Sequence, residues 1–178
     1  FRSTVNPHLY DENLELSLYY IVKEFHPDVV HCFGTEYPHT LAMCRVVPDK
    51  NRILIGIQGL CKVYADAYFA DLPRKVIQSA TLRDVLKKDG LREQQNKFVL
   101  RGEMEQEAIT LAGNVTGRTA WDKHYTRLWN PNARYYKMNE TLRASFYKEQ
   151  WRPENCEPHS IFLSQGDYPI KGLHYMLL

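Results

Sequence analysis

The fold is decided by residues 28–33, DVVHCF, an apolar run rich in β-branched side chains that stops at Gly34. A second run of the same kind, residues 52–57 (RILIGI), is followed by Gln58 and Gly59. Short apolar runs bounded by turn residues are typical of strands buried in a parallel sheet. Residues 38–47 lie between the two runs and have the pattern of a helix. This order predicts a strand, a helix and a second strand parallel to the first.

The same alternation continues along the chain. Further helices are predicted over residues 12–25, 81–88, 91–112 and 119–128, and further strands over residues 114–118 and 133–138. Residues 60–74 have no clear pattern, and Pro73 limits any helix there. The alternation predicts an α/β fold, a Rossmann-like parallel sheet flanked by helices with right-handed crossovers. His31 and Cys32 lie inside the first strand and are expected to be core residues.

The composition is that of one folded domain. The chain has 178 residues, of which 44% are hydrophobic, and 23 basic against 21 acidic side chains leave a net charge of +2. A charge so close to zero excludes a strongly cationic nucleic-acid binder, so no nucleic-acid partner is expected. No apolar run approaches the roughly 18 residues of a spanning helix, and residues 1–11 lack the pattern of a signal peptide. We therefore expect a cytoplasmic protein.

Cysteine and histidine spacing predicts neither disulfides nor a metal site. The four cysteines form no Cys-x-x-Cys pair and are expected to be reduced. The seven histidines form neither His-x-x-x-His nor His-x-Glu, so no metal is expected.

The last part of the chain breaks the alternation. Residues 151–158, WRPENCEP, contain two prolines and are expected to form a junction. Residues 160–164 are predicted to form another strand, followed by a Gly-Asp-Tyr-Pro turn and the opening of an amphipathic helix. Because the chain starts at Phe1 and this helix stops after two turns, we expect an excised piece of a longer protein.

Several stretches, taken together, resemble the retaining glycosyltransferases of family 4. They are residues 27–36 (PDVVHCFGTE), 57–60 (IQGL), 118–122 (RTAWD), 136–142 (YKMNETL) with Phe146 after it, and above all 161–173 (IFLSQGDYPIKGL). The resemblance covers the chain from about Pro27 to its end. It implies the GT-B architecture, in which two Rossmann-like domains face each other across a cleft.

The resemblance also implies a division of the chain. Residues 1–158 would be the later part of the N-terminal, acceptor-side domain, and residues 159–178 the first strand, turn and partial helix of the C-terminal, donor-side domain. In the family, a lysine followed by glycine reaches the donor diphosphate, and Lys171 matches it. Gln165 stands where the family has an arginine, and Gly166 would allow the backbone to approach a phosphate closely. The family's glutamate pair lies beyond residue 178, so we expect this chain alone to be inactive.

The implied acceptor side of the cleft lies at the carboxyl ends of the strands. Polar residues that follow these strands are the candidates, namely Thr35, Glu36, Gln58 and Asn139. A hydroxyl, a carboxylate or an amide at these positions would bind sugar hydroxyls. For Thr35 and Glu36, capping of the helix that follows is an equally good interpretation.

The resemblance implies transfer of a hexosyl group, with retention, from a nucleotide-diphosphate sugar to a carbohydrate or lipid-linked acceptor, as in polysaccharide biosynthesis, with no cofactor. Peripheral membrane association, and homo-oligomers formed through residues 159–178, stay open as interactions. Two other functions stay open. One is a stand-alone α/β binding or regulatory module. The other is a non-catalytic homologue of the transferases, because Gln165 lacks the usual charge and Phe33 stands where the family commonly has a histidine.

Overall fold

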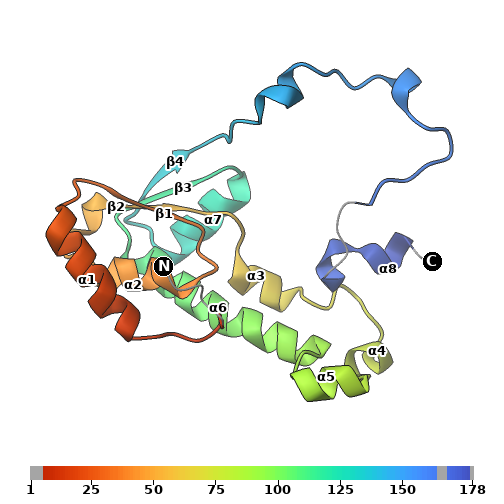
Figure 1. The fold of residues 1–178 in the computed structure, drawn as a ribbon, viewed down its shortest axis with the longest axis horizontal. Helices are drawn as coiled ribbons and strands as arrows, with labels where there is room; N and C mark the ends of the chain where they lie inside the picture. Colours follow the sequence, from red (N-terminus) through yellow and green to blue (C-terminus); the bar gives the residue numbers. More distant parts are fainter. Residues whose placement is uncertain (1–5, 164–167, 177–178) are drawn as a thin grey trace.

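The computed structural model describes residues 6–163 and 168–176, which form four strands and eight α-helices. The strands are β1 (Val30–Phe33), β2 (Ile53–Gly56), β3 (Asn114–Gly117) and β4 (Arg134–Lys137). The helices are α1 (Asn13–Phe25), α2 (Pro38–Val46), α3 (Cys61–Asp66), α4 (Arg74–Gln78), α5 (Leu82–Lys87), α6 (Leu91–Leu111), α7 (Ala120–Trp129) and α8 (Leu173–Met176). Figure 1 shows their arrangement.

All four strands are parallel and lie in the order β1-β2-β3-β4, so each strand pairs with the next one in the chain. The predicted α/β fold with a parallel sheet is therefore confirmed, and a Rossmann-like arrangement is consistent with it. The predicted strands and helices before residue 139 all occur, with ends that differ from the predicted ones by a few residues. The stretch without a pattern, residues 60–74, contains α3 and the start of α4.

The helices that connect the strands pack against one face of the sheet. One buried cluster contains Leu41 of α2, Ile55 of β2, Ile109 of α6 and Val115 of β3, and Trp129 of α7 packs against it. Helix α1 packs on α2. When strands follow each other in sequence order, right-handed crossovers place every connecting helix on the same side. The strand order therefore accounts for a core with helices on a single face (Figure 1).

The opposite face of the sheet is left open by the described part of the chain. Cys32 pairs with Ile55 and faces the helices, so His31 and Phe33, its neighbours in β1, face the other way. Phe33 is 62% exposed, and its ring centroid lies 4.0 Å from that of His31, which is exposed as well. The prediction that Cys32 is buried is confirmed. The prediction of a core histidine at position 31 is wrong, because β1 is buried on one face only.

A long, mostly helical connection separates β2 from β3. Helix α6 has 21 residues, and the N–H of Gly113 just after it donates to the carbonyl of Lys50 at the amino end of β2 (2.9 Å). A helix of this length spans about 31 Å, whereas a four-residue strand spans about 13 Å. The N-terminal part of α6 therefore extends beyond the carboxyl edge of the sheet and carries α4 and α5 with it (Figure 1).

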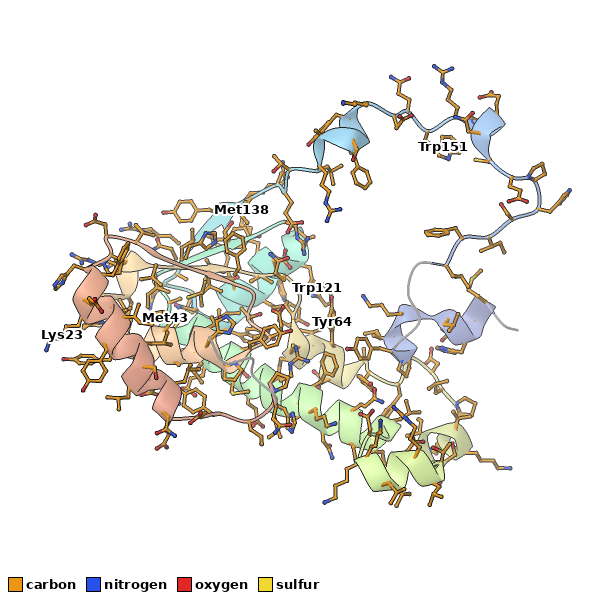
Figure 2. All side chains as sticks on the ribbon, in the orientation of Figure 1. Lys23, Met43, Tyr64, Trp121, Met138 and Trp151 are labelled. Carbon is orange, nitrogen blue, oxygen red and sulfur yellow. The ribbon has the colours of Figure 1, made fainter. Side chains whose placement is uncertain are left out.

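Residues 139–163 lead away from the sheet as an extended segment. Trp151 is 80% exposed and stands apart from the helices and strands in Figure 2. The predicted strand does not form over residues 160–163, because no strand of the described chain lies beside them to complete its hydrogen bonds; residue 164 lies outside the described residues. After this segment, where the described residues resume, the ring of Tyr168 lies 5.4 Å from that of Phe98 in α6.

Two further expectations concern the whole chain. All four cysteines are free, as predicted, with Cys156 exposed and the other three buried. None of the helices in the described ranges combines the length and the apolar character that crossing a membrane requires.

The close contact between α3 and α6 yields a test of this packing. A Cβ at Gly102 of α6 would lie 2.5 Å from the Cα of Lys62 in α3, so Gly102→Ala forces the two backbones apart. We expect the free energy of unfolding to fall by about 1–3 kcal/mol in urea denaturation, although alanine is the better helix former.

Glu103→Ala, at the neighbouring exposed position, is the matched control and should change the unfolding free energy little. An unchanged urea midpoint for Gly102→Ala would contradict the close contact between α3 and α6.

Candidate functional site

The loops that follow the four strands meet at the carboxyl edge of the sheet, because the strands are parallel. The backbone ladder continues into them: Gly34 donates to Gly56 (2.8 Å), Ile57 to Thr116 (2.9 Å) and Met138 to Gly117 (3.0 Å). All the predicted acceptor-side residues lie in these loops. Thr35 and Glu36 follow β1, Gln58 follows β2, and Asn139 follows β4. The structure therefore brings the ends of these strands together at one edge.

Arg118, in the loop after β3, joins the neighbouring loops. Its Nη2 donates to the carbonyl of Gln58 (2.9 Å), and its Nη1 lies 3.1 Å from the Glu140 carboxylate. Both side chains of the ion pair are partly exposed, so the pair itself stabilises the fold by at most about 1 kcal/mol. Its consequence is positional, because the loops after β2 and β4 are both held by one guanidinium. Arg118 and Glu140 were not among the predicted site residues.

At this edge, the backbone N–H groups at the N-terminus of α7 already have hydrogen-bond partners in neighbouring side chains. Thr119 caps the helix, as predicted, and its hydroxyl accepts from the N–H of Asp122 (3.1 Å). The Asp122 carboxylate accepts from the N–H groups of Arg118 (2.8 Å) and Thr119 (2.9 Å). A bound anion would have to displace this carboxylate, so the start of α7 is not a phosphate site here.

Thr35 is buried and its hydroxyl is used inside the protein. It donates a hydrogen bond to the Glu105 carboxylate of α6. In this arrangement the hydroxyl faces the core, so it is not available to a sugar. Thr35 instead fixes the loop after β1 against the long helix. Capping of the next helix does not occur either, because Tyr37 is the residue that precedes α2.

Glu105 is the buried charge around which this region is organised. Its carboxylate accepts from the backbone N–H of Lys62 (3.0 Å) and from that of Cys61, at the start of α3. Burial raises the pKa of the Glu105 carboxyl to about 7, although the hydrogen bonds from Lys62, Thr35 and Cys61 oppose that shift. The sequence contains one signal for it: residue 105 lies three and four positions before the buried Ala108 and Ile109, on the same side of the helix.

Glu36 has a polar group without a described partner. Its Oε2 is buried and has no hydrogen-bond partner among the described residues. The side chain lies back over Gly34, whose φ of +82° would strain any larger residue, and a Cβ there would lie 2.5 Å from Oε2, so the carboxylate would have to move as well. The backbone carbonyl of Glu36 accepts from Nε of Arg101 (2.8 Å). Because this oxygen is buried, a ligand hydroxyl can donate a hydrogen bond to it only after the side chain turns outward.

Lys171 lies in a different part of the structure from the acceptor-side residues. It ends a short 3-10 turn, Pro169–Lys171, and Gly172 and α8 follow it, as the predicted lysine–glycine–helix order requires. His174 and Tyr175 of α8 hydrogen-bond to the carbonyl of Ala70 (3.0 and 3.1 Å). Figure 1 shows this segment beside the turn after α3, away from the loop after β4. The two other predicted donor-side residues, Gln165 and Gly166, lie outside the described residues.

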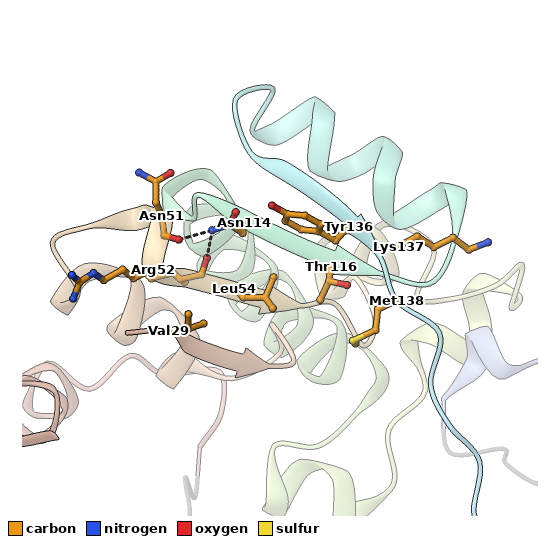
Figure 3. A pocket seen from close by; sticks show the side chains of 10 residues that line it. Val29, Asn51, Arg52, Leu54, Asn114, Thr116, Tyr136, Lys137 and Met138 are labelled. Atoms are coloured by element: carbon orange, nitrogen blue, oxygen red, sulfur yellow. Dashed lines mark hydrogen bonds between the residues drawn. The ribbon is translucent and has the colours of Figure 1, made fainter. Parts of the chain in front are cut away.

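A groove lies on the open face of the sheet, and none of the predicted acceptor-side residues line it. It is a groove of about 460 Å³ bordered by apolar side chains, among them Val29, Leu54, Tyr136 and Met138 (Figure 3). At its amino end, the Asn114 amide donates to the carbonyls of Asn51 (2.8 Å) and Ile53 (3.1 Å). The floor is mostly apolar, and one polar atom on it, Oγ1 of Thr116, is buried without a hydrogen-bond partner among the described residues.

The residues at the carboxyl edge are therefore suited to binding the polar groups of a ligand. The carboxyl edge offers a carboxylate, two amides and a guanidinium, and within residues 6–163 and 168–176 no group of three His, Cys, Asp or Glu side chains is placed to hold a metal ion. Comparison of the chain with known protein families, with curated proteins and with solved structures found no match.

The buried carboxyl of Glu105 gives a pH prediction. Its pKa is about 7 in the folded protein, against an ordinary value of 4.5, so the folded protein binds the proton more tightly and loses stability as the pH rises through that window. Relative to the wild type, Glu105→Gln should therefore gain on the order of 2–3 kcal/mol of unfolding free energy between pH 5 and pH 8.

Urea denaturation of both proteins at several pH values measures this difference. Glu103→Gln in the same helix is exposed and should follow the wild-type profile. If the wild-type and Glu105→Gln profiles run parallel from pH 5 to pH 8, the raised pKa is wrong.

Proposed function

We propose that this chain is part of a retaining glycosyltransferase of the GT-B type. It would transfer a hexosyl group in the cytoplasm from a nucleotide-diphosphate sugar to a carbohydrate or lipid-linked acceptor. The observation that carries the proposal is the carboxyl edge of the parallel sheet, where Glu36, Gln58, Arg118 and Asn139 come together in the loops. Parallel α/β sheets bind their ligands at this edge.

The open face supports the view that residues 1–158 are the later part of an acceptor-side domain. Parallel sheets are almost always covered on both faces, yet Val29 on this face is 64% exposed beside a groove of about 460 Å³. A doubly wound sheet covers its second face with helices from strands on the other side of its first pair. In this chain those strands would extend the free edge of β1.

The acceptor would be held by hydrogen bonds at the carboxyl edge. The Glu36 carboxylate, whose buried Oε2 has no partner among the described residues, would turn outward to accept a hydrogen bond from a sugar hydroxyl, and the amides of Gln58 and Asn139 can donate or accept. Arg118 keeps the loops after β2 and β4 in register for this purpose. Such groups contribute by positioning the attacking hydroxyl rather than by forming bonds with it.

The donor would be held by Lys171, with Gln165 and Gly166 before it. The Lys171 ammonium would offset the charge of the diphosphate and the charge that develops on it as the glycosidic bond breaks. Residues 159–178 would in this proposal begin the donor-side domain. The rest of that domain would supply the remaining donor contacts.

A variant of Lys171 tests the donor side. In the transferase that contains this chain, Lys171→Ala should lower kcat about 100-fold, because one cation on the leaving diphosphate is lost. Release of nucleotide diphosphate from a panel of nucleotide sugars, with the acceptor present, measures this rate. Lys148→Ala, an exposed lysine of the extended segment, is the control and should leave the rate unchanged. Equal rates for the two variants would contradict the donor role.

A variant of Glu36 tests the acceptor side. Glu36→Gln keeps the shape of the side chain and removes its charge, so we expect KM for the acceptor to rise about tenfold while KM for the donor stays constant. Glu103→Gln is the matched control. Should KM for both substrates change together, or neither change, the acceptor role of Glu36 is refuted.

One observation favours the alternative of a stand-alone binding module. Residues 168–176 do not add to a second sheet; instead Tyr168 packs on Phe98, and Tyr175 donates to the Asp71 carboxylate (3.2 Å). A module of this kind would have no transfer activity with any nucleotide sugar. The same assay therefore distinguishes the two functions, because only the transferase loses activity when Lys171 is replaced.

A further inference from the structure

Apolar side chains project into solvent at one end of the molecule, on helix α5. Leu82 is 77% exposed and Leu86 is 76% exposed, and Val85 between them is exposed too. Positions 82, 85 and 86 lie on one side of a helix. None of the three residues belongs to the buried hydrophobic cluster of the core. This apolar ridge is therefore not part of the folding core.

The ridge is held in a fixed orientation. Thr81 and Asp84 form a capping box at the start of α5, with each side chain bonded to the other's backbone N–H (3.2 and 2.9 Å). At the other end, the Asp89 carboxylate lies 3.3 Å from the Lys97 ammonium of α6. The exposure of the ridge is thus a property of an ordered helix.

Positive charge surrounds the ridge. Residues 73–92 hold six basic and two acidic side chains, a net charge of +4, so the rest of the chain carries −2. Both acidic residues are engaged in the contacts just described. Five of the basic residues have no ion-pair partner among the described residues, namely Arg74, Lys75, Lys87, Lys88 and Arg92. An anionic surface complements this segment.

We propose that the α4–α5 hairpin, residues 73–92, binds the surface of a bilayer that contains anionic lipids. Leu82, Val85 and Leu86 insert at the boundary between head groups and acyl chains, and the lysines and arginines contact the head-group phosphates. A helix with a basic side and an apolar side is the element that lies in a membrane interface.

Other occupants fit less well. A second copy of the chain docking through the same hairpin would bring two segments of net charge +4 together. A folded protein partner needs about 800 Å² of complementary surface on each side, whereas α5 has six residues and projects as a ridge. A bilayer needs no such complementarity.

The inference rests on the proposed function, whose lipid-linked acceptor it would place at a bilayer, but its test needs no substrate. The 178-residue chain is mixed with phosphatidylcholine vesicles, with or without phosphatidylglycerol, and the bound fraction is measured by flotation. We expect binding only to the phosphatidylglycerol vesicles, and weaker binding as the salt concentration rises. Failure of this binding, with transfer activity present in the transferase that contains this chain, would overturn the inference alone.

Two double substitutions test whether vesicle binding depends on the hairpin or is nonspecific adsorption. Leu82→Ser with Leu86→Ser, and Lys87→Glu with Lys88→Glu, should each reduce vesicle binding by about tenfold or more. Leu142→Ser with Phe146→Ser removes two exposed apolar side chains of the extended segment and should leave binding unchanged. Lys123→Glu with Arg127→Glu on α7 is the matched charge control and should reduce binding less.

Circular dichroism should show that all four variants keep the fold, since the replaced side chains are exposed. The inference is overturned if the wild-type chain does not bind phosphatidylglycerol vesicles. It is also overturned if the hairpin variants bind these vesicles as well as the wild type does. If sedimentation instead shows a dimer that the Leu82 and Leu86 substitutions dissociate, the ridge is an interface between copies and the membrane role is wrong.

Discussion

The right-handed crossover is the constraint on which the rest of this structure depends. Four parallel strands that pair in sequence order allow only one placement of the connecting helices, on a single face. The core then forms on that face from Leu41, Ile55, Ile109 and Val115. The parallel direction of the strands sends all four following loops to one edge. The apolar groove on the other face, and the gathering of polar residues at the edge, are two consequences of one topology.

A buried carboxylate ties the edge to the helical layer. Glu105 of α6 binds Thr35 after β1 and the backbone of Lys62 at the start of α3. An apolar residue at this position would leave the N–H groups at the start of α3 without a partner, and an unpaired buried donor costs about 1–3 kcal/mol. The close approach of α3 to α6 at Gly102 depends on the same contact, because the two helices meet where the carboxylate receives its hydrogen bonds. The loop after β1 and the start of α3 thus depend on one ionisable group.

The sequence was sufficient for the four strands and for the order of most helices, because strand periodicity and the Thr119 and Thr81 caps act over a few residues, but it did not predict α3 or α4. It did not predict that His31 is exposed, since residues 28–33 have the same composition whether one face or both are covered. It also did not predict the roles of Thr35 and Glu105. These residues are 70 positions apart, and their contact depends on where α6 crosses the edge. The strand expected over residues 160–164 failed for a related reason, because a strand needs a neighbour that the local sequence does not encode.

The length of α6 connects the candidate site to the proposed membrane surface. The helix exceeds the strands by about 18 Å, and because its C-terminal end is anchored at the amino edge by Gly113 and Lys50, all of the excess lies beyond the carboxyl edge. The basic and apolar hairpin therefore projects on the side of the molecule where Glu36, Gln58 and Asn139 lie. A bilayer that received Leu82 and Leu86 would lie on that side of the molecule. Under the proposed function, such a bilayer would hold a lipid-linked acceptor near the edge, whereas the hairpin would do nothing to concentrate a freely diffusing sugar. A lipid-linked acceptor would therefore fit the proposal better than a free carbohydrate.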